Sequence, residues 1–356
     1  MGGPFVISCL CDLDDSFENR RAMQMLRPAV ALVLAAGVGA QAQPPTADAP
    51  VTNGPRTDHA LGAYDVRLRR VILIGGAGNP VSDQRDHVWS WDGLGWELVS
   101  DAGPPGRVNA GAAYDSARGK VVVTGGSRKT SSSDESWEVV GDSWEGDRYG
   151  WRRLADIVPR DHQSMAESGR GSLLMFGGIP AVRSGPWPND TWELQGDAWR
   201  RVATGGPVAR GRAGMVYDGK RKEVVLFGGV SAPSGSDEHQ VFMNDTWIWD
   251  GERWKQAAGN GPRGRYAHGM VFDERNGVVL LYGGAAAHRD APLRDMWQWD
   301  GTRWTEIPLT GPTPGYRYQP VMVYDNARGK TILYGGLGGQ TDTWEWDGRR
   351  WREIRP

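Results

Sequence analysis

Six copies of one sequence unit fill the chain from residue 56 to its end. In each copy, a run of aliphatic and β-branched residues ends in a double glycine, at intervals of 50 to 55 residues. The double glycines are Gly75-Gly76, Gly125-Gly126, Gly177-Gly178, Gly228-Gly229, Gly283-Gly284 and Gly335-Gly336. A repeat of this length is one supersecondary unit that buries its apolar face only against its neighbours. The body of the protein is therefore predicted to consist of six packed copies.

Two tryptophans, seven residues apart, follow each double glycine. The pairs are Trp89/Trp96, Trp137/Trp144, Trp192/Trp199, Trp247/Trp254, Trp297/Trp304 and Trp344/Trp351. Four copies read W-x-W-D-G-x-x-W, so sixteen of the eighteen tryptophans fit the repeat, and only Trp151 and Trp187 fall outside it. Because an aromatic side chain buries about 150–250 Å², these indole rings are predicted to pack between the copies. Trp151 is placed at the start of a fourth strand, after a short insertion.

Each copy is predicted to form four short strands. An arginine opens strand A, which ends at an aromatic-Asp pair such as Tyr64-Asp65. Strand B is the apolar run, strand C surrounds the first tryptophan, and strand D begins at the second. Asp-Gly between C and D indicates a tight hairpin, because glycine tolerates a positive φ. Continuous apolar character in strand B indicates a strand that is buried on both faces.

The period, the double glycine and the tryptophan that follows it resemble the kelch repeat. Six such repeats over residues 56–356 imply an all-β fold, a six-bladed kelch-type β-propeller of four-stranded antiparallel blades. The first repeat begins with strand A and the last ends with strand D. Neither blade needs a strand from the other end of the chain, so the ring is expected to close by packing of blade 1 against blade 6.

The strand order places the D-to-A and B-to-C connections on one face of the ring. The B-to-C connections vary in length and the opposite turns do not, so the variable face is predicted to bind the ligand. Its candidate ligand-binding residues are Arg85, His87, Arg183, Trp187, Glu238, His239, His288 and Arg289. Trp187 lies in a proline-flanked loop and is the candidate for stacking on a ligand.

The arginines that open the A strands form a second set of candidates. Strand A is innermost in a propeller, so these residues are predicted to surround the channel mouth, where they could hold a carboxylate, a sulfate or an acidic peptide. They are Arg56, Arg107, Arg160, Arg210, Arg265 and Arg317, with Arg212 beside them. The alternative is a structural role, in which each arginine pairs with backbone carbonyls or with an aspartate. If they bind a ligand, Arg265→Ala should leave the melting temperature nearly unchanged.

An aspartate precedes the first tryptophan by two residues in four blades and is expected to stabilise a local turn. These residues are Asp190, Asp245, Asp295 and Asp342.

Several enzyme classes of similar architecture are excluded or disfavoured by residue type. Kelch-type copper oxidases need a thioether-linked cysteine, and both cysteines, Cys9 and Cys11, lie ahead of the repeats. The E-x-x-x-D-x-x-x-H run of the iron-dependent specifier proteins does not occur, nor do H-x-H or H-E-x-x-H. His59, His162 and His268 lie near the starts of three A strands, where a shared metal site is disfavoured. No metal and no cofactor is predicted, and catalytic residues remain unassigned.

The first 55 residues have the features of an export signal. Residues 25–42 carry an arginine, an apolar run and the small-x-small pattern Ala40-Gln41-Ala42, so a signal peptide is predicted with cleavage after Ala42. Residues 1–24 are interpreted as an extension caused by a mis-assigned start or as an n-region. Residues 43–55 are proline-rich and are interpreted as a linker. The apolar run is too short for a permanent anchor, so no membrane insertion is expected after cleavage.

The predicted function is that of a secreted or periplasmic binding protein. The formal net charge is −2, so electrostatics do not favour nucleic acid. The partner is expected to be a protein, peptide or glycan on the variable face, and the protein is expected to be a monomer. The alternative is a metal-free sugar isomerase or mutarotase, because the sialic acid mutarotases resemble this six-repeat, exported architecture.

Overall fold

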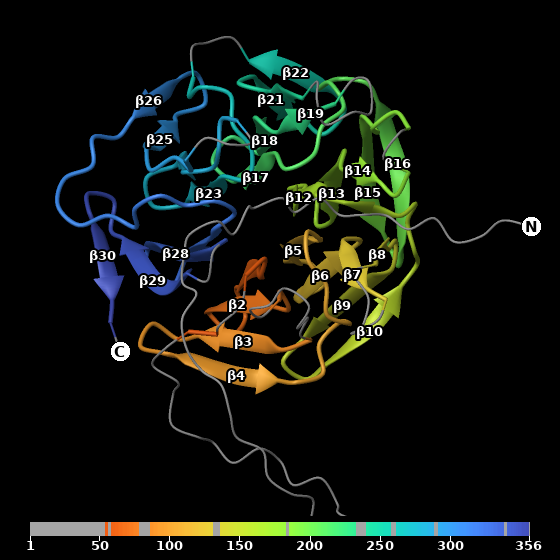
Figure 1. Ribbon diagram of the computed structural model, residues 1–356, viewed down its shortest axis with the longest axis horizontal. Coiled ribbons are helices and arrows are strands. Elements are labelled where there is room, and N and C mark those ends of the chain that lie inside the picture. The colour runs from red at the N-terminus through yellow and green to blue at the C-terminus, as the bar shows by residue number, and fades with distance from the viewer. Residues whose placement is uncertain are drawn as a thin grey trace, which may run out of the picture.

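The chain forms a ring of six four-stranded antiparallel sheets around a central axis (Figure 1). The computed structural model describes residues 54–55, 58–77, 86–130, 136–182, 185–232, 240–257, 261–287, 291–337 and 340–355. Every one of the six sheets is antiparallel and built from one continuous stretch of chain, which confirms the prediction of an all-β six-bladed propeller. In these ranges no helix is long and apolar enough to span a membrane.

The blades follow one another along the chain, with the innermost strand first. Blade 1 contains β1 (Leu61–Asp65), β2 (Arg70–Ile74), β3 (Val88–Trp91) and β4 (Trp96–Ser100); blade 2 contains β5 (Gly111–Asp115), β6 (Lys120–Thr124), β9 (Ser143–Asp147) and β10 (Gly150–Leu154). Blade 3 contains β12 (Ser164–Glu167), β13 (Leu173–Phe176), β15 (Asp190–Gln195) and β16 (Ala198–Thr204); blade 4 contains β17 (Gly214–Asp218), β18 (Glu223–Phe227), β21 (Thr246–Trp249) and β22 (Trp254–Ala257). Blade 5 contains β23 (Gly269–Asp273), β24 (Val278–Tyr282), β25 (Met296–Trp299) and β26 (Trp304–Glu306); blade 6 contains β27 (Val321–Asp325), β28 (Lys330–Gly336), β29 (Gln340–Trp346) and β30 (Trp351–Ile354).

Three small two-stranded sheets lie on the face that carries the B-to-C connections, which is called the loop face below. They pair β7 (Ser127–Lys129) with β8 (Trp137–Val139), β11 (Arg160–Asp161) with β14 (Ile179–Pro180), and β19 (Val230–Ser231) with β20 (Val241–Phe242). In β11 and β14, the segment before a strand A pairs with the segment after a strand B. Both kinds of connection therefore emerge on the same face, as the strand order predicted.

The double glycine ends strand B because the chain there has no room for a side chain. Gly125 and Gly126 both have positive φ, at 63° and 97°. A Cβ on Gly125 would lie 2.5 Å from the backbone oxygen of Arg160 in the next blade. Glycine meets both demands, since it has no Cβ and tolerates the left-handed region. The motif thus brings adjacent blades into backbone contact on the loop face.

The second tryptophan of a blade docks against the preceding blade. The ring of Trp304 meets that of Phe227 at 5.1 Å in an edge-to-face arrangement, and its Nε1 donates to Thr246 Oγ1 at 2.9 Å. Trp254 makes the same two contacts with Phe176 and Thr191. Aromatic pairs in this geometry contribute about 0.5–1.5 kcal/mol beyond the area they bury. The predicted role of the tryptophans between blades is confirmed.

Side-chain sizes alternate where neighbouring A strands meet. A Cβ on Gly214 of β17 would lie 2.7 Å from Met270 Sδ of the next blade, and one on Gly269 would lie 2.9 Å from Met322 Sδ. Between blades 6 and 1 the sizes are exchanged, because Val321 packs against Gly62. Complementary volumes keep the seams dense even though the residues differ.

The ring closes by packing of blade 1 against blade 6, as predicted. Trp91 and Trp96 of blade 1 form one apolar cluster with Val323, Ile332 and Tyr334 of blade 6. Trp96 Nε1 also donates to Thr343 Oγ1 at 3.0 Å, and its ring meets that of Tyr334 at 5.0 Å.

Blade 2 corrects one detail of the repeat assignment. Trp137, which the spacing placed in strand C, lies in the small strand β8. Strand C is β9 with Trp144, and strand D is β10 with Trp151, as expected for Trp151. Trp144 and Trp151 are also seven residues apart, so the spacing alone fits two registers and the first tryptophan of blade 2 was assigned one strand too early.

Candidate functional site

Five of the arginines that open the A strands are buried inside their own blades. Arg265 has no exposed surface, and its guanidinium donates to both carboxylate oxygens of Asp295 at 2.7 Å and to the Gly283 carbonyl at 3.0 Å. The same partners, an aspartate and the first glycine of the pair, recur in each case. The arginine frame, as we name this set, consists of Arg107–Asp142, Arg160–Asp190, Arg210–Asp245, Arg265–Asp295 and Arg317–Asp342.

The frame gives the aspartates a role other than the expected local turn. In four of the five pairs, the carboxylate also accepts a hydrogen bond from the tryptophan two residues later, as Asp295 does from Trp297 Nε1 at 2.8 Å. Arg263 contributes a further acceptor, its carbonyl, to Arg265 Nε. Ligand binding by Arg107, Arg160, Arg210, Arg265 and Arg317 remains an untested prediction, but these guanidinium groups already have partners inside the protein. Arg56 lies outside the described residues.

Two residues after each frame arginine, the backbone adopts the left-handed conformation without glycine. The φ angles lie between 54° and 58° in all six blades. We call this set the mouth ring; its members are His59, Asn109, His162, Arg212, Ala267 and Gln319. In blade 1 the ring residue follows the β-bridge residue Asp58, as Asn109 follows Val108. A positive φ is uncommon outside glycine and, when it recurs, calls for an explanation.

Backbone hydrogen bonds join the ring residues of successive blades. The amide of His162 donates to the carbonyl of Asn109 at 2.7 Å, and that of Arg212 to His162 at 2.9 Å. Ala267 then donates to Arg212 at 3.0 Å, and Gln319 to Ala267 at 2.7 Å. The left-handed turn therefore directs each peptide toward the next blade, which explains why the conformation is kept whatever the side chain is.

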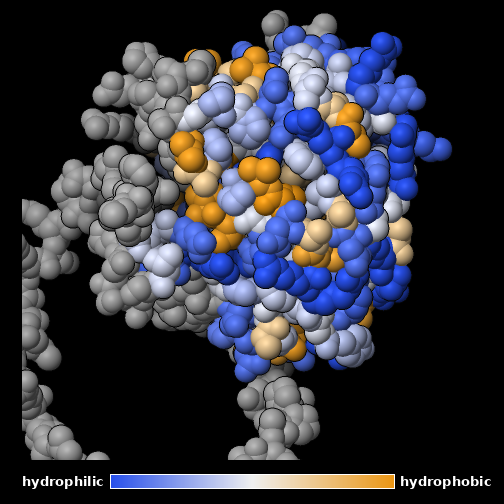
Figure 2. Space-filling view, turned by 90° about the vertical axis from the view of Figure 1, so that its right-hand side faces the viewer, coloured by the Kyte–Doolittle hydropathy of each residue, from blue (hydrophilic) through white to orange (hydrophobic). Residues whose placement is uncertain are grey.

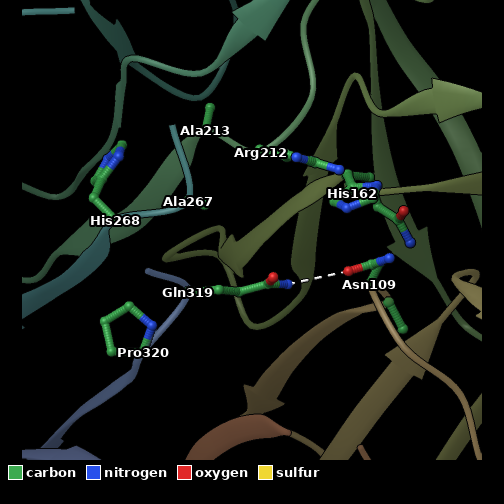
Figure 3. A pocket seen from close by; sticks show the side chains of 10 residues that line it. Asn109, His162, Arg212, Ala213, Ala267, His268, Gln319 and Pro320 are labelled. Atoms are coloured by element: carbon green, nitrogen blue, oxygen red, sulfur yellow. Dashed lines mark hydrogen bonds between the residues drawn. The ribbon is translucent and has the colours of Figure 1, made fainter. Parts of the chain in front are cut away.

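The side chains of the mouth ring meet above the channel, as Figure 3 shows for those it labels. Gln319 of blade 6 donates from Nε2 to Asn109 Oδ1 of blade 2 at 3.1 Å, and His59 Nδ1 lies 3.0 Å from the same oxygen. Burial lowers the pKa of His59 to about 4, and the charge of Arg212 acts in the same direction, against the Asn109 hydrogen bond. The imidazole of His59 is therefore neutral at pH 7.

A cavity of about 150 Å³ lies at this mouth; we call it the mouth cavity. Its walls come from blades 2 to 6 and are mostly polar. They comprise Asn109, Ala110, His162, Gln163, Arg212, Ala213, Ala267, His268, Gln319 and Pro320. Ala267 is the one apolar member of the mouth ring, so its short side chain leaves the space open between Arg212 and Gln319. Below it, a channel cavity of about 220 Å³ is lined by the A strands of all six blades and shares several wall residues.

Arg212 is held by aromatic residues at the edge of the mouth cavity. Its Nη1 donates to the Tyr318 hydroxyl at 2.9 Å, and its guanidinium lies 5.5 Å from the ring centre of Tyr266. Tyr266 in turn packs edge to face against Tyr318. A guanidinium stacked and hydrogen-bonded in this way is pre-organised for planar polar groups.

His162 is held by a buried carboxylate. Its Nδ1 lies 2.9 Å from Asp161 Oδ1, and Ser127 donates to the other oxygen of Asp161 at 2.7 Å. Asp161 has no exposed surface. A carboxylate on Nδ1 fixes the tautomer and the orientation of an imidazole, as required of a histidine that transfers protons.

Among the predicted residues that the structure describes, Arg212 alone lines the mouth cavity. Trp187 is 9% exposed and packs in an apolar cluster with Ile179, Val230 and Tyr266, so the structure places it in the protein interior and not in a position to stack on a ligand. His87 is half-buried, and its carbonyl accepts from the Gly75 amide. Six other candidates lie outside the described residues: Arg85, Arg183, Glu238, His239, His288 and Arg289.

The prediction missed most of the mouth ring. Asn109, Gln319 and Ala267 carry no motif, and their conformation cannot be inferred from residue type because none is glycine. Their position in the repeat could have identified them, because each lies two residues after a repeated arginine. The sequence analysis places His59, His162 and His268 near the starts of three A strands, but it considers them only as metal ligands and disfavours that role. Within the described ranges no group of three or more His, Cys, Asp or Glu side chains is arranged to hold a metal.

Comparisons with known proteins support the fold and leave the activity open. No family model matches the chain, and no curated protein matches its sequence. Among solved structures, that of YjhT aligns with a TM-score of 0.65, covering 85% of this chain and 98% of that one. The two sequences are 14% identical, so the likeness shows a shared propeller fold and nothing finer.

Proposed function

We propose that this protein is a kelch-type propeller that is exported, cleaved after Ala42, and binds a protein, peptide or glycan ligand through the mouth cavity and the loop face around it. The kelch assignment rests on the six double glycines and their tryptophan pairs. The location in the periplasm or outside the cell rests on the signal-like residues 25–42. The protein acts as a monomer in this proposal, and nucleic acid is not its partner.

One observation carries the binding role, namely the mouth ring with its non-glycine residues. A left-handed backbone costs an ordinary residue about 1 kcal/mol, and glycine would remove that cost. The chain nevertheless has five polar side chains and one alanine at six equivalent positions. Strain that is retained at converging side chains is typical of a site that uses those side chains.

The experiment fills the cavity and leaves the frame unchanged. Ala267→Asn introduces a side chain that tolerates the left-handed conformation and occupies the space between Arg212 and Gln319. We expect binding on a glycan and peptide array to fall at least ten-fold, with a change in melting temperature of no more than a few degrees. Lys222→Asn is the matched control, because Lys222 has φ 60° in the A-to-B turn on the opposite face.

Equal loss of binding in both variants, or binding that persists in Ala267→Asn, would contradict the proposal. The first result would indicate a general effect on the fold. The second would move the binding site from the mouth to another part of the loop face.

A second candidate function is supported by the pair Asp161–His162 at the cavity wall. A histidine oriented by a buried carboxylate is suited to metal-free proton transfer, as a sugar isomerase or mutarotase requires. In an NMR experiment on sialic acid, such an enzyme would accelerate exchange between the two anomers. Asp161→Asn should then reduce the exchange rate more than it reduces binding. Binding without accelerated exchange would leave the first function.

A further inference from the structure

Two side chains on the wall of the mouth cavity carry polar atoms that have no partner among the described residues. They are Gln163, through Oε1, and His268, through both ring nitrogens. Gln163 is 5% exposed and His268 is 8% exposed. A polar atom that is buried without a hydrogen bond destabilises the fold, so the few such atoms in a native protein need an explanation. Here all three belong to residues that line one cavity.

Packing fixes the orientation of the His268 ring. A Cβ on Gly214 would lie 2.6 Å from His268 Nε2, and one on Gly228 would lie 3.2 Å from Cε1. On another side, the ring meets Phe227 edge to face at 5.7 Å. The imidazole is thus packed between two glycines and an aromatic ring, which restricts its rotation.

His268 is uncharged at neutral pH. Burial lowers its pKa to about 3, the charge of Arg265 acts in the same direction, and that of Asp295 opposes both. A neutral imidazole has one donor nitrogen and one acceptor nitrogen. It therefore offers a poor site for a carboxylate and a good one for a group that both donates and accepts.

Gln163, which lines the same cavity, contributes the second unpartnered group. Its Nε2 donates to the Thr124 carbonyl at 2.5 Å, which identifies this atom as the nitrogen, because a carbonyl cannot donate. The remaining atom, Oε1, is an acceptor. A ligand group that forms a hydrogen bond with Oε1 must therefore be a donor, such as a hydroxyl.

We propose that Gln163 and His268 form a hydroxyl-recognition site, and that the ligand end entering the mouth cavity is a neutral polyhydroxylated group such as a sugar. A hydroxyl donates to Gln163 Oε1 or to the acceptor nitrogen of His268, and it accepts from the donor nitrogen. This inference rests on the proposed binding function and selects glycans among its three ligand classes. The cavity, at about 150 Å³, admits the end of a chain and not a folded domain.

The decisive variant is His268→Phe. It keeps an aromatic ring against Phe227 and removes two unpartnered nitrogens, so the melting temperature should stay the same or rise. Saturation-transfer NMR would measure binding of glucose, galactose, mannose and N-acetylglucosamine, with glucuronic acid and acetate as the anionic arm. We expect the neutral sugar that binds best to the wild type to bind at least ten-fold more weakly to the variant.

A second variant and a direct measurement keep the test independent of folding. Gln163→Met is close to isosteric and removes both Oε1 and the Nε2 donor to the Thr124 carbonyl, so it should weaken binding of the same sugar, with its melting temperature measured alongside. Met322→Leu is the control, because Met322 lines the channel cavity and not the mouth cavity. In the wild type, adding the sugar should shift the ¹⁵N resonances of the His268 ring, since those nitrogens gain hydrogen bonds.

Several outcomes would overturn the inference. Unchanged sugar binding in His268→Phe would show that the unpartnered nitrogens of His268 do not contact the sugar and bond only to water. Binding of acetate and glucuronic acid without neutral sugars would assign the cavity to carboxylates at Arg212. In either case, loss of binding in Ala267→Asn would still support the mouth cavity as the binding site. Binding that is unaffected by any of these variants would remove the proposed function itself.

Discussion

The arginine frame and the mouth ring lie two residues apart along the chain, and they differ in almost every physical respect. The frame repeats one residue type in five described blades, is 0% to 3% exposed, and has its charge neutralised by an aspartate in each blade. The ring repeats one backbone conformation and varies the residue type. Uniform side chains in the frame hold the blades in the same shape, so the residue type can vary in the ring while its backbone geometry stays the same. Repetition therefore marks the scaffold here, and variation at a fixed geometry marks the site.

The largest expected effect is on stability, from breaking the frame. Arg265→Ala leaves Asp295 without its bidentate partner and opens a cavity inside blade 5. Removing one member of a buried ion pair costs about 3–5 kcal/mol. We expect urea unfolding to show a loss of about 3 kcal/mol, opposite to the earlier expectation of an unchanged melting temperature. Arg303→Ala is the control, because Arg303 is 77% exposed and lies 3.7 Å from Asp300.

A loss below about 1 kcal/mol for Arg265→Ala would place this arginine with the ring and not with the frame. The ligand role predicted from the sequence would then regain support.

The second effect comes from the buried histidines of the mouth. The pKa of His59 is about 4 and that of His268 about 3, both below the ordinary value near 6.5. As the pH falls through this window, the unfolded chain binds protons that the folded chain does not, so stability decreases. We expect a loss of roughly 2–3 kcal/mol between pH 7 and pH 4 in urea titrations. His268→Phe should remove a large part of this slope, and an unchanged slope would contradict the burial of His268.

The third effect is a loss of stability from protonation of a frame aspartate, which occurs at lower pH than the effect of the mouth histidines. Burial alone would raise the pKa of Asp142, but hydrogen bonds from Arg107 and Trp144 outweigh it and lower the pKa to about 2. This stability is present above the ordinary pKa near 4 and is lost as the pH falls toward 2. We expect a loss of roughly 1–2 kcal/mol in that range, which Asp142→Asn should abolish. The free energy of unfolding therefore decreases below pH 4 because the frame aspartate is protonated. Between pH 7 and pH 4 it decreases because of the buried histidines.

Residue pattern alone predicted the strand order, the number of blades, the loop face and the closure between blades 1 and 6. These features follow from burial and from turn chemistry, which leave repeated signals such as the double glycines. The assignment of tryptophans to strands in blade 2 was wrong because Trp137 and Trp144 have the same seven-residue spacing as Trp144 and Trp151. Asp142, two residues before Trp144, would have identified the correct register.

The candidate site was harder to predict, because its position depends on tertiary geometry. The left-handed φ at Asn109 or Gln319 is imposed by hydrogen bonds to the neighbouring blade, and no local residue preference reports it. The unpartnered atoms of Gln163 and His268 are likewise defined by what surrounds them. The six arginines were predicted to bind a ligand because positive charge near a channel mouth favours anionic ligands. In the structure, five of them are buried and paired with aspartates of their own blades.

The smallest expected effect compares the two sets within one blade. Gln319→Gly removes the hydrogen bond to Asn109, a loss of about 0.5–1.5 kcal/mol, and relieves a left-handed residue with φ 56°, a gain of about 1 kcal/mol. The two terms nearly cancel, so the free energy of unfolding should change by less than about 1 kcal/mol. Arg317→Ala, two residues earlier, should cost several times more, because Arg317 is 2% exposed and bonded to Asp342. Similar losses from both variants, measured side by side in urea, would show that ring and frame are one structural unit and that residue variation at the mouth carries no information about a ligand.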